Sequence, residues 1–140
     1  MPGFKHNYTL FLSHSWRYGG DYDQLLRLLK TAPDFNWRNT SRPQCNPGID
    51  PESAAWAREL ILALHGQIKP ADCVLLISGL YRATPWIQIA INVANYYRKP
   101  MVGLLPRYGQ MPAQPVQAAV KEMVDWEARE IVEAVKRNAV

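Results

Sequence analysis

Residues 81–92 combine the start of a helix with side chains that could bind a ligand. Thr84 and Pro85 predict the helix start, because threonine can cap free backbone N–H groups and proline fits a first turn that needs no N–H. Tyr81 and Trp86 lie on either side of that start. No carboxylate follows. The stretch therefore has the aromatic groups of a ligand site but lacks an acid for catalysis.

A second group of polar side chains follows the first apolar run of the chain. Ser13, His14 and Ser15 offer hydroxyls and an imidazole that could bind phosphate or ribose oxygens, although such serines also bond the backbone of their own loop. His14 has no cysteine or aspartate at nucleophile spacing, so we expect no hydrolase triad. The three histidines lack the spacing of metal ligands, and we expect no metal site.

Short apolar runs alternate along the chain with segments of helical periodicity. Strands are predicted over residues 8–13, 35–39, 73–77 and 100–105 and within 120–126. Helices are predicted from residue 21, from residues 50–51 to the proline at 70, over 84–97, and from 128 onward, with loops over 40–48 and 107–115. This alternation predicts an α/β fold, namely a flavodoxin-like three-layer sandwich whose parallel five-stranded sheet has the order 2-1-3-4-5.

Sheets of this kind bind ligands beyond the carboxyl ends of their strands. The segments that follow those ends are Ser13–Arg17, Asn39–Ser41, Ser78–Tyr81 and Pro106–Arg107. We therefore expect the functional site where these four segments meet.

The composition is that of one soluble globular domain over residues 1–140, with 48% hydrophobic and 20% charged residues. No apolar run approaches the about 20 residues of a membrane span, and the N-terminus does not resemble a signal peptide, so we expect a cytoplasmic protein without a membrane partner. The basic residues behind the net charge of +4 are scattered, which favours a phosphate-bearing small molecule over nucleic acid. Cys45 and Cys73 are expected to be buried free thiols.

Several functions of flavodoxin-like proteins do not fit the residues. A phosphoacceptor receiver would need acidic residues after the first and third strands and a lysine after the fifth, and these are missing. A flavin-phosphate loop would place glycines closely after the first strand, whereas Gly19 and Gly20 come late and follow bulky aromatic residues. The glycine patterns of P-loop and dinucleotide-binding folds are also missing.

Six blocks of the sequence form a common pattern: Phe11-Leu-Ser-His-Ser-Trp16, Tyr22-Asp-Gln-Leu25, Phe35-Asn-Trp-Arg-Asn39, Ala71-Asp-Cys-Val-Leu-Leu-Ile-Ser-Gly-Leu-Tyr81, Trp86-Ile-Gln and Lys99-Pro-Met-Val-Gly103. Together they resemble bacterial TIR-like domains and, more narrowly, the TIR-domain signalling subunit of Thoeris anti-phage defence. The resemblance covers nearly the whole chain. Its specific parts are the Ser-His-Ser-Trp and Trp-Arg-Asn blocks.

The resemblance implies an enzyme that takes NAD⁺ as its substrate and needs no other cofactor. Such domains cleave NAD⁺ at the nicotinamide ribosyl bond and release a cyclic ADP-ribose isomer or a related signal. The diffusible product then activates a separate effector protein. Because TIR sites are often completed by a neighbouring subunit, the resemblance also implies a homo-oligomer.

The family places its catalytic glutamate four residues after the tryptophan of the third helix. In this sequence the tryptophan is Trp86, and the fourth residue after it is Ala90. Four residues make about one helical turn, so the two positions share a face of the predicted helix. Gln88 does not replace the acid, because an amide carries no negative charge and an offset of two residues points it away.

Two hypotheses explain the alanine at position 90. The first is an engineered replacement of the family's glutamate, which leaves a protein able to bind NAD⁺ without consuming it. The second is a natural loss, which leaves a catalytically silent interaction or scaffold module. We favour the first because the expected substrate-binding residues look intact; these are Ser13, His14, Ser15, Trp37, Asn39, Tyr81, Trp86 and Arg107.

Most of these residues also have a plainer interpretation. Trp37 and Trp86 could stack on nicotinamide or adenine, although a tryptophan near a sheet more often belongs to the core. Tyr81 could contact the ligand or a neighbouring subunit, or lie in solvent. Arg107 is a candidate phosphate partner, and a solvated loop arginine is the alternative.

Overall fold

The structure is a computed structural model of the chain, and it describes residues 7–13, 19–41, 54–77, 85–105 and 114–139. Its strands are β1 (Asn7–Leu12), β2 (Asn36–Asn39), β3 (Cys73–Ile77), β4 (Met101–Leu104) and β5 (Glu122–Val124). They form one sheet of order β2-β1-β3-β4-β5 in which every neighbouring pair is parallel. The predicted order 2-1-3-4-5 is confirmed.

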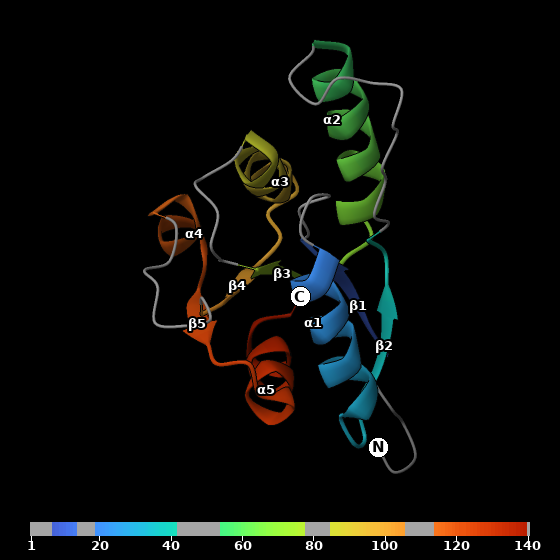
Figure 1. The fold of residues 1–140 in the computed structure, drawn as a ribbon, viewed down its shortest axis with the longest axis vertical. Coiled ribbons are helices and arrows are strands. Elements are labelled where there is room, and N and C mark those ends of the chain that lie inside the picture. Colours follow the sequence, from blue (N-terminus) through green and yellow to red (C-terminus); the bar gives the residue numbers. More distant parts are fainter. Residues whose placement is uncertain (1–6, 14–18, 42–53, 78–84, 106–113, 140) are drawn as a thin grey trace.

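The helices cover both faces of this sheet and make a three-layer α/β sandwich (Figure 1). They are α1 (Gly19–Thr31), α2 (Ala54–Ile68), α3 (Pro85–Tyr96), α4 (Gln114–Ala119) and α5 (Ala128–Asn138). α1 and α5 contact each other on one face, while α3 packs between α2 and α4 on the other. The flavodoxin-like fold class predicted from the sequence is therefore the one observed.

Two apolar clusters, one on each face of the sheet, hold the layers together. Alternate residues of a strand point to opposite faces, so Leu10 and Leu12 enter the cluster beneath α1 and α5, whereas Phe11 enters the cluster beneath α2, α3 and α4. All five residues of β3 are buried, as expected for a parallel strand covered on both faces. Each fully buried leucine side chain stabilises the folded state by about 1.5–3 kcal/mol, because its apolar surface is removed from water.

The region before the fifth strand differs from the sequence prediction. A loop was expected up to Pro115, but α4 begins at Gln114 and continues to Ala119. Proline at the second helical position is compatible with the first turn, because the N–H groups of a first turn have no acceptor within the helix and the N–H that proline lacks is not needed. The fully buried Val116 packs α4 against the core, and the short strand that follows, Glu122–Val124, lies within the range expected for the fifth strand.

Cys73, the first residue of β3, is a buried free thiol, as predicted. Burial raises the pKa of its thiol to about 12, because the charged thiolate is poorly solvated there. A thiol of this kind is unreactive at neutral pH. Cys45 lies outside the described residues.

Within the described ranges, no helix is both long enough and apolar enough to span a membrane.

Candidate functional site

The carboxyl edge of the sheet is fixed by Ser13, the residue that follows β1. Its backbone N–H donates to the carbonyl of Leu75 at 2.8 Å, and its hydroxyl oxygen accepts a hydrogen bond from the backbone N–H of Ile77 at 2.8 Å. The residue is only 1% exposed. The serine therefore bonds the backbone of β3, not that of its own loop, and it holds the ends of β1 and β3 together.

The end of β2 is fixed in a similar way. The backbone N–H and the hydroxyl of Thr40 both donate to the carbonyl of Leu10, at 2.9 and 3.2 Å. The side-chain oxygen of Asn39 accepts from the backbone N–H of Ser41 at 2.9 Å and from the Ser41 hydroxyl. This is the Asx turn that asparagine forms with a residue two positions on. It holds Asn39 at the carboxyl end of the edge strand.

Asn39 lines a cavity of about 590 Å³ between β2 and α2. The residues around this cavity are Arg38, Asn39, Thr40, Leu62, Ala63, Gly66, Gln67 and Pro70. The sequence predicted Asn39 as a binding residue and placed Thr40 in the same strand-end segment, but it did not indicate the other lining residues. Arg38 and Thr40 could have been predicted as lining residues, because they flank Asn39 at the end of a strand. The lining residues of α2 come more than twenty residues later, and no local sequence pattern indicates that they lie beside Asn39.

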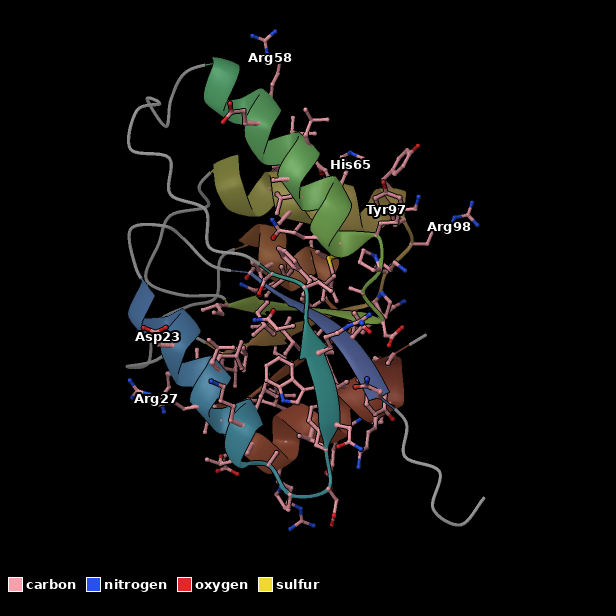
Figure 2. The ribbon with its side chains drawn as sticks, turned by 90° about the vertical axis from the view of Figure 1, so that its right-hand side faces the viewer. Asp23, Arg27, Arg58, His65, Tyr97 and Arg98 are labelled. Carbon is pink, nitrogen blue, oxygen red and sulfur yellow. The ribbon has the colours of Figure 1, made fainter. Side chains whose placement is uncertain are left out.

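α2 and α3 are joined near their C-terminal ends by a hydrogen bond of 2.7 Å between Nδ1 of His65 and the hydroxyl of Tyr97. Figure 2 shows these two side chains together, while Arg58 and Arg98 point away from the body of the molecule. The ring of Tyr96 also meets His65 and Tyr97 edge to face, with centroids 5.5 and 4.9 Å away. Together, the hydrogen bond and these ring contacts hold the end of α3 against α2.

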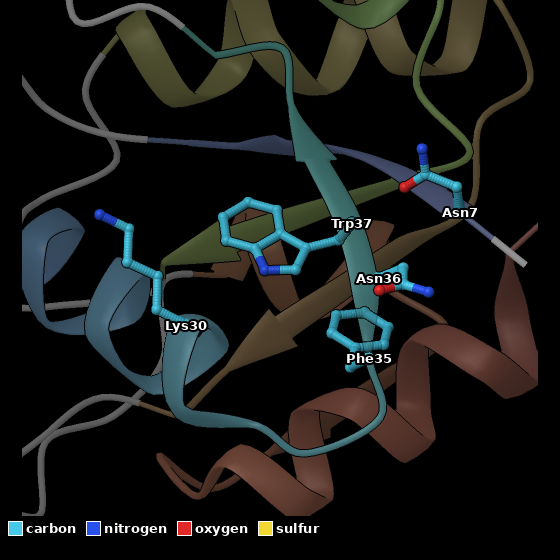
Figure 3. A pocket seen from close by; sticks show the side chains of 5 residues that line it. All are labelled: Asn7, Lys30, Phe35, Asn36 and Trp37. Carbon is cyan, nitrogen blue, oxygen red and sulfur yellow. The ribbon is translucent and has the colours of Figure 1, made fainter. Parts of the chain in front are cut away.

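Trp37 lies in a different cavity from Asn39, although the two residues are neighbours on one side of β2. The Trp37 cavity has a volume of about 510 Å³ and is also lined by Asn7, Lys30, Phe35 and Asn36 (Figure 3). Asn7 and Asn36 are the first residues of their strands, so this cavity lies toward the amino edge of the sheet. Trp37 also packs partly buried against the core beneath α1 and α5. Within the part of the chain that the structure describes, Trp37 and Asn39 thus line separate cavities.

Position 90 lies in the second turn of α3, and its side chain is completely buried among the apolar residues beneath α2, α3 and α4. Because β3 and β4 are parallel, α3 runs back from the carboxyl edge of the sheet toward the amino edge. Helical Cα–Cβ bonds tilt toward the N-terminus, so a longer side chain at position 90 would extend toward the carboxyl edge.

Gln88 lies on the solvent side of the same helix. It is exposed, and its side-chain amide donates to the Asn92 side-chain oxygen at 2.9 Å, whereas Ala90 is 0% exposed. Gln88 therefore cannot stand in for an acid at position 90, as the helical offset predicted.

The remaining predicted site residues are not described. Trp86 lies in the first turn of α3, one turn before Ala90, but its side chain is outside the described set. His14, Ser15, Tyr81 and Arg107 lie outside the described residues altogether. Among the residues that are described, no three His, Cys, Asp or Glu side chains gather in a way that could hold a metal ion.

No protein-family model and no curated protein matches this sequence. Solved structures match its fold. A 2-deoxyribosyltransferase from the psychrotolerant bacterium Bacillus psychrosaccharolyticus aligns with a TM-score of 0.54 and 17% identity, over 84% of this chain and 87% of that one. A Clostridium botulinum CMP N-glycosidase aligns with a TM-score of 0.52 and 13% identity, over 92% and 98%. A conserved protein from Enterococcus faecalis V583 aligns with a TM-score of 0.61 and 11% identity, over 94% and 99%. At these identities the likeness shows a common fold.

Proposed function

We propose that this chain is a TIR-like NAD⁺ nucleosidase or ADP-ribosyl cyclase of anti-phage signalling in which alanine occupies the position of the catalytic glutamate. The observation that carries the proposal is the placement of Ala90, which lies on the inward face of α3 in the helix's second turn, one turn after Trp86. An acid there would extend toward the edge where α/β sheets bind ligands. Two proteins that share the fold are named for chemistry on nucleosides or nucleotides, as a deoxyribosyltransferase and a CMP N-glycosidase.

The proposed reaction explains why one carboxylate suffices. Breaking the bond between nicotinamide and ribose passes through a state with oxocarbenium character, and a nearby carboxylate balances the developing positive charge and orients the ribose hydroxyls. Nicotinamide leaves as a neutral molecule, so no general acid is needed to expel it. Loss of one such electrostatic group typically lowers the rate by about 10²–10³-fold. The chain with Ala90 should therefore bind NAD⁺ and turn it over very slowly.

The rest of the proposal concerns substrate and partners. NAD⁺ is the substrate, and the protein needs no other cofactor. The cyclic or linear ADP-ribose product diffuses in the cytoplasm to a separate effector protein, so the chain need not contact that effector. A homo-oligomer would complete the site with groups from a neighbouring subunit.

A catalytically silent interaction module is the second candidate. The observation that favours it is the complete burial of Ala90 in an apolar cluster that also contains Ile91 and Ala94. A small apolar residue suits this position well, and a carboxylate there would lose solvation. On this hypothesis the chain acts by assembling with partners.

The two candidates differ in how they respond to a glutamate at position 90. We would incubate the chain with Ala90, the Ala90→Glu variant and the Ala90→Gln variant with NAD⁺ and measure nicotinamide release. Mass spectrometry of the ADP-ribose product separates cyclisation from hydrolysis. Ala94→Glu is the matched control, because Ala94 is also 0% exposed on the same helix but lies one turn further from the carboxyl edge.

The enzyme proposal expects release at least about 100-fold faster for Ala90→Glu than for the other three proteins. Circular dichroism must show that both glutamate variants are folded, since each introduces a charge into the core. If folded Ala90→Glu is as slow as Ala94→Glu while self-association persists, the enzyme proposal fails and the interaction module replaces it.

A further inference from the structure

The cavity between β2 and α2 is separate from position 90. Leu62 and Gly66 lie on the side of α2 that lines the cavity, whereas His65 lies on another side and contacts Tyr97 beyond the end of α3. α2 therefore stands between the cavity and α3, which carries Ala90. A ligand in this cavity would touch Asn39, which is also expected to bind NAD⁺, but it would lie away from position 90.

The helix wall of the cavity has two features that packing does not require. Leu62 is 73% exposed, so α2 presents a large apolar side chain to water at the cavity. Gly66 lies inside α2, where glycine costs about 1 kcal/mol relative to alanine. A Cβ at Gly66 would meet no heavy atom within 4 Å, so no neighbour demands glycine there. Both features leave space and apolar surface available to a ligand.

The strand wall of the cavity supplies a positive charge. Arg38 is exposed in β2 and lines the cavity, and it forms no ion pair within the described part of the chain. None of the described lining residues is acidic. This electrostatic environment favours an anion.

We propose that this cavity binds a phosphorylated ligand of about the size of a mononucleotide. The guanidinium of Arg38 would hold the phosphate through paired hydrogen bonds, while Leu62 and Pro70 would contact the apolar face of the ligand's ring. Thr40 adds a hydroxyl to the polar wall. The volume of about 590 Å³ falls within the range of about 300–1,000 Å³ that is usual for small-molecule sites.

The test measures binding by calorimetry with four probes: AMP, ribose 5-phosphate, inorganic phosphate and adenosine. AMP should bind most tightly, and adenosine, which lacks the phosphate, should bind at least about tenfold more weakly. Arg38→Gln should weaken AMP binding by about tenfold or more. Arg58→Gln removes the same charge from a site on α2 that does not line the cavity, and it should change AMP affinity by less than about twofold.

A cavity-filling variant tests the location independently of charge. Gly66→Leu should abolish AMP binding, and Gly66→Ala, the milder substitution, should weaken it while raising the melting temperature of the free protein. The proposal is overturned if AMP shows no saturable binding, if adenosine binds as well as AMP, or if Arg38→Gln and Arg58→Gln weaken binding equally. It is also overturned if both folded Gly66 variants keep full affinity. None of these variants alters position 90, so the result does not depend on whether the chain cleaves NAD⁺.

Discussion

The hydroxyl oxygen of Ser13 accepts a hydrogen bond from the backbone N–H of Ile77 at 2.8 Å, and this contact joins the ends of β1 and β3 inside the protein. The serine thus maintains the shape of the carboxyl edge whether or not it also touches a ligand. Any effect of a Ser13 variant on ligand binding must be separated from its effect on folding.

Ser13→Ala should lower the free energy of unfolding by about 1–3 kcal/mol, because the buried N–H of Ile77 loses its acceptor. Urea titration followed by circular dichroism measures this loss. Thr31→Ala is the control, since the exposed Thr31 hydroxyl donates to the Leu28 carbonyl at 3.0 Å and its removal should cost no more than about 0.5 kcal/mol. Equal stability of the Ser13→Ala variant and the parent protein would contradict a structural role for this serine.

Tyr97→Phe removes the hydroxyl that bonds Nδ1 of His65 and keeps the ring in place. We expect a loss of about 0.5–1.5 kcal/mol in unfolding free energy, because the bond is partly buried and links α2 to α3. Tyr96→Phe is the matched control on the neighbouring, 72% exposed tyrosine and should be close to neutral. Thermal unfolding of the two variants side by side measures the difference, and equal melting temperatures would argue against a stabilising bond.

Glu122 links the start of β5 to the end of α5. Its carboxylate accepts hydrogen bonds from Arg137 at 2.7 and 3.2 Å and from the Asn138 side chain at 2.6 Å. The Arg137 bond, helped by Asn138, holds the pKa of Glu122 below its ordinary value of 4.5. A carboxyl group with a lowered pKa in the folded protein adds stability above its unfolded pKa and loses it as the pH falls through the folded pKa.

Glu122→Gln should therefore reduce the free energy of unfolding at pH 7, by up to about 1 kcal/mol because the pair is partly solvated. The difference in unfolding free energy between the variant and the parent protein should shrink as the pH falls below 4.5. Denaturant titrations at pH 7 and in acid measure it. Glu133→Gln breaks a more exposed pair with Arg129 and should have little effect at either pH. A pH-independent penalty for Glu122→Gln would show that the charge is not the cause.

Local sequence patterns were sufficient for the elements whose residues are buried by a regular period. β3 was predicted at its observed bounds, Cys73–Ile77, because five apolar residues in succession suit a strand covered on both faces. Helical spacing likewise separated Ala90 from the exposed Gln88. α4 was missed because Pro115 was taken as a loop residue, although proline is compatible with the first turn of a helix.

The candidate site was harder to predict because its geometry depends on contacts between distant segments. Residues two apart in a strand point to the same side, as Trp37 and Asn39 do, yet α2 contributes to the cavity that Asn39 lines and not to the cavity that Trp37 lines. The bond between His65 and Tyr97 joins residues 32 positions apart. Nothing in the spacing of either residue indicates its partner.

Gly103, in β4, faces Met123 and Val120, and its lack of a side chain makes room for both. A Cβ built at Gly103 would collide with the sulfur of Met123 and would lie 3.2 Å from Cγ1 of Val120. Gly103→Ala should therefore lower the free energy of unfolding by about 1 kcal/mol, at the low end of the cost of overpacking, because the flexible end of the half-buried Met123 side chain must turn aside.

A double-mutant cycle shows whether this collision is the cause. In a Met123→Ala background the obstructing sulfur is gone, so Gly103→Ala should cost at least about 0.5 kcal/mol less than it does in the parent chain. Urea titration of the four proteins gives the coupling energy. A penalty of the same size in both backgrounds would mean that Met123 is not what the glycine accommodates. Met123→Ala also leaves a cavity, which lowers the free energy of unfolding by itself. This loss is common to the two proteins that carry Met123→Ala, so it cancels when their stabilities are compared.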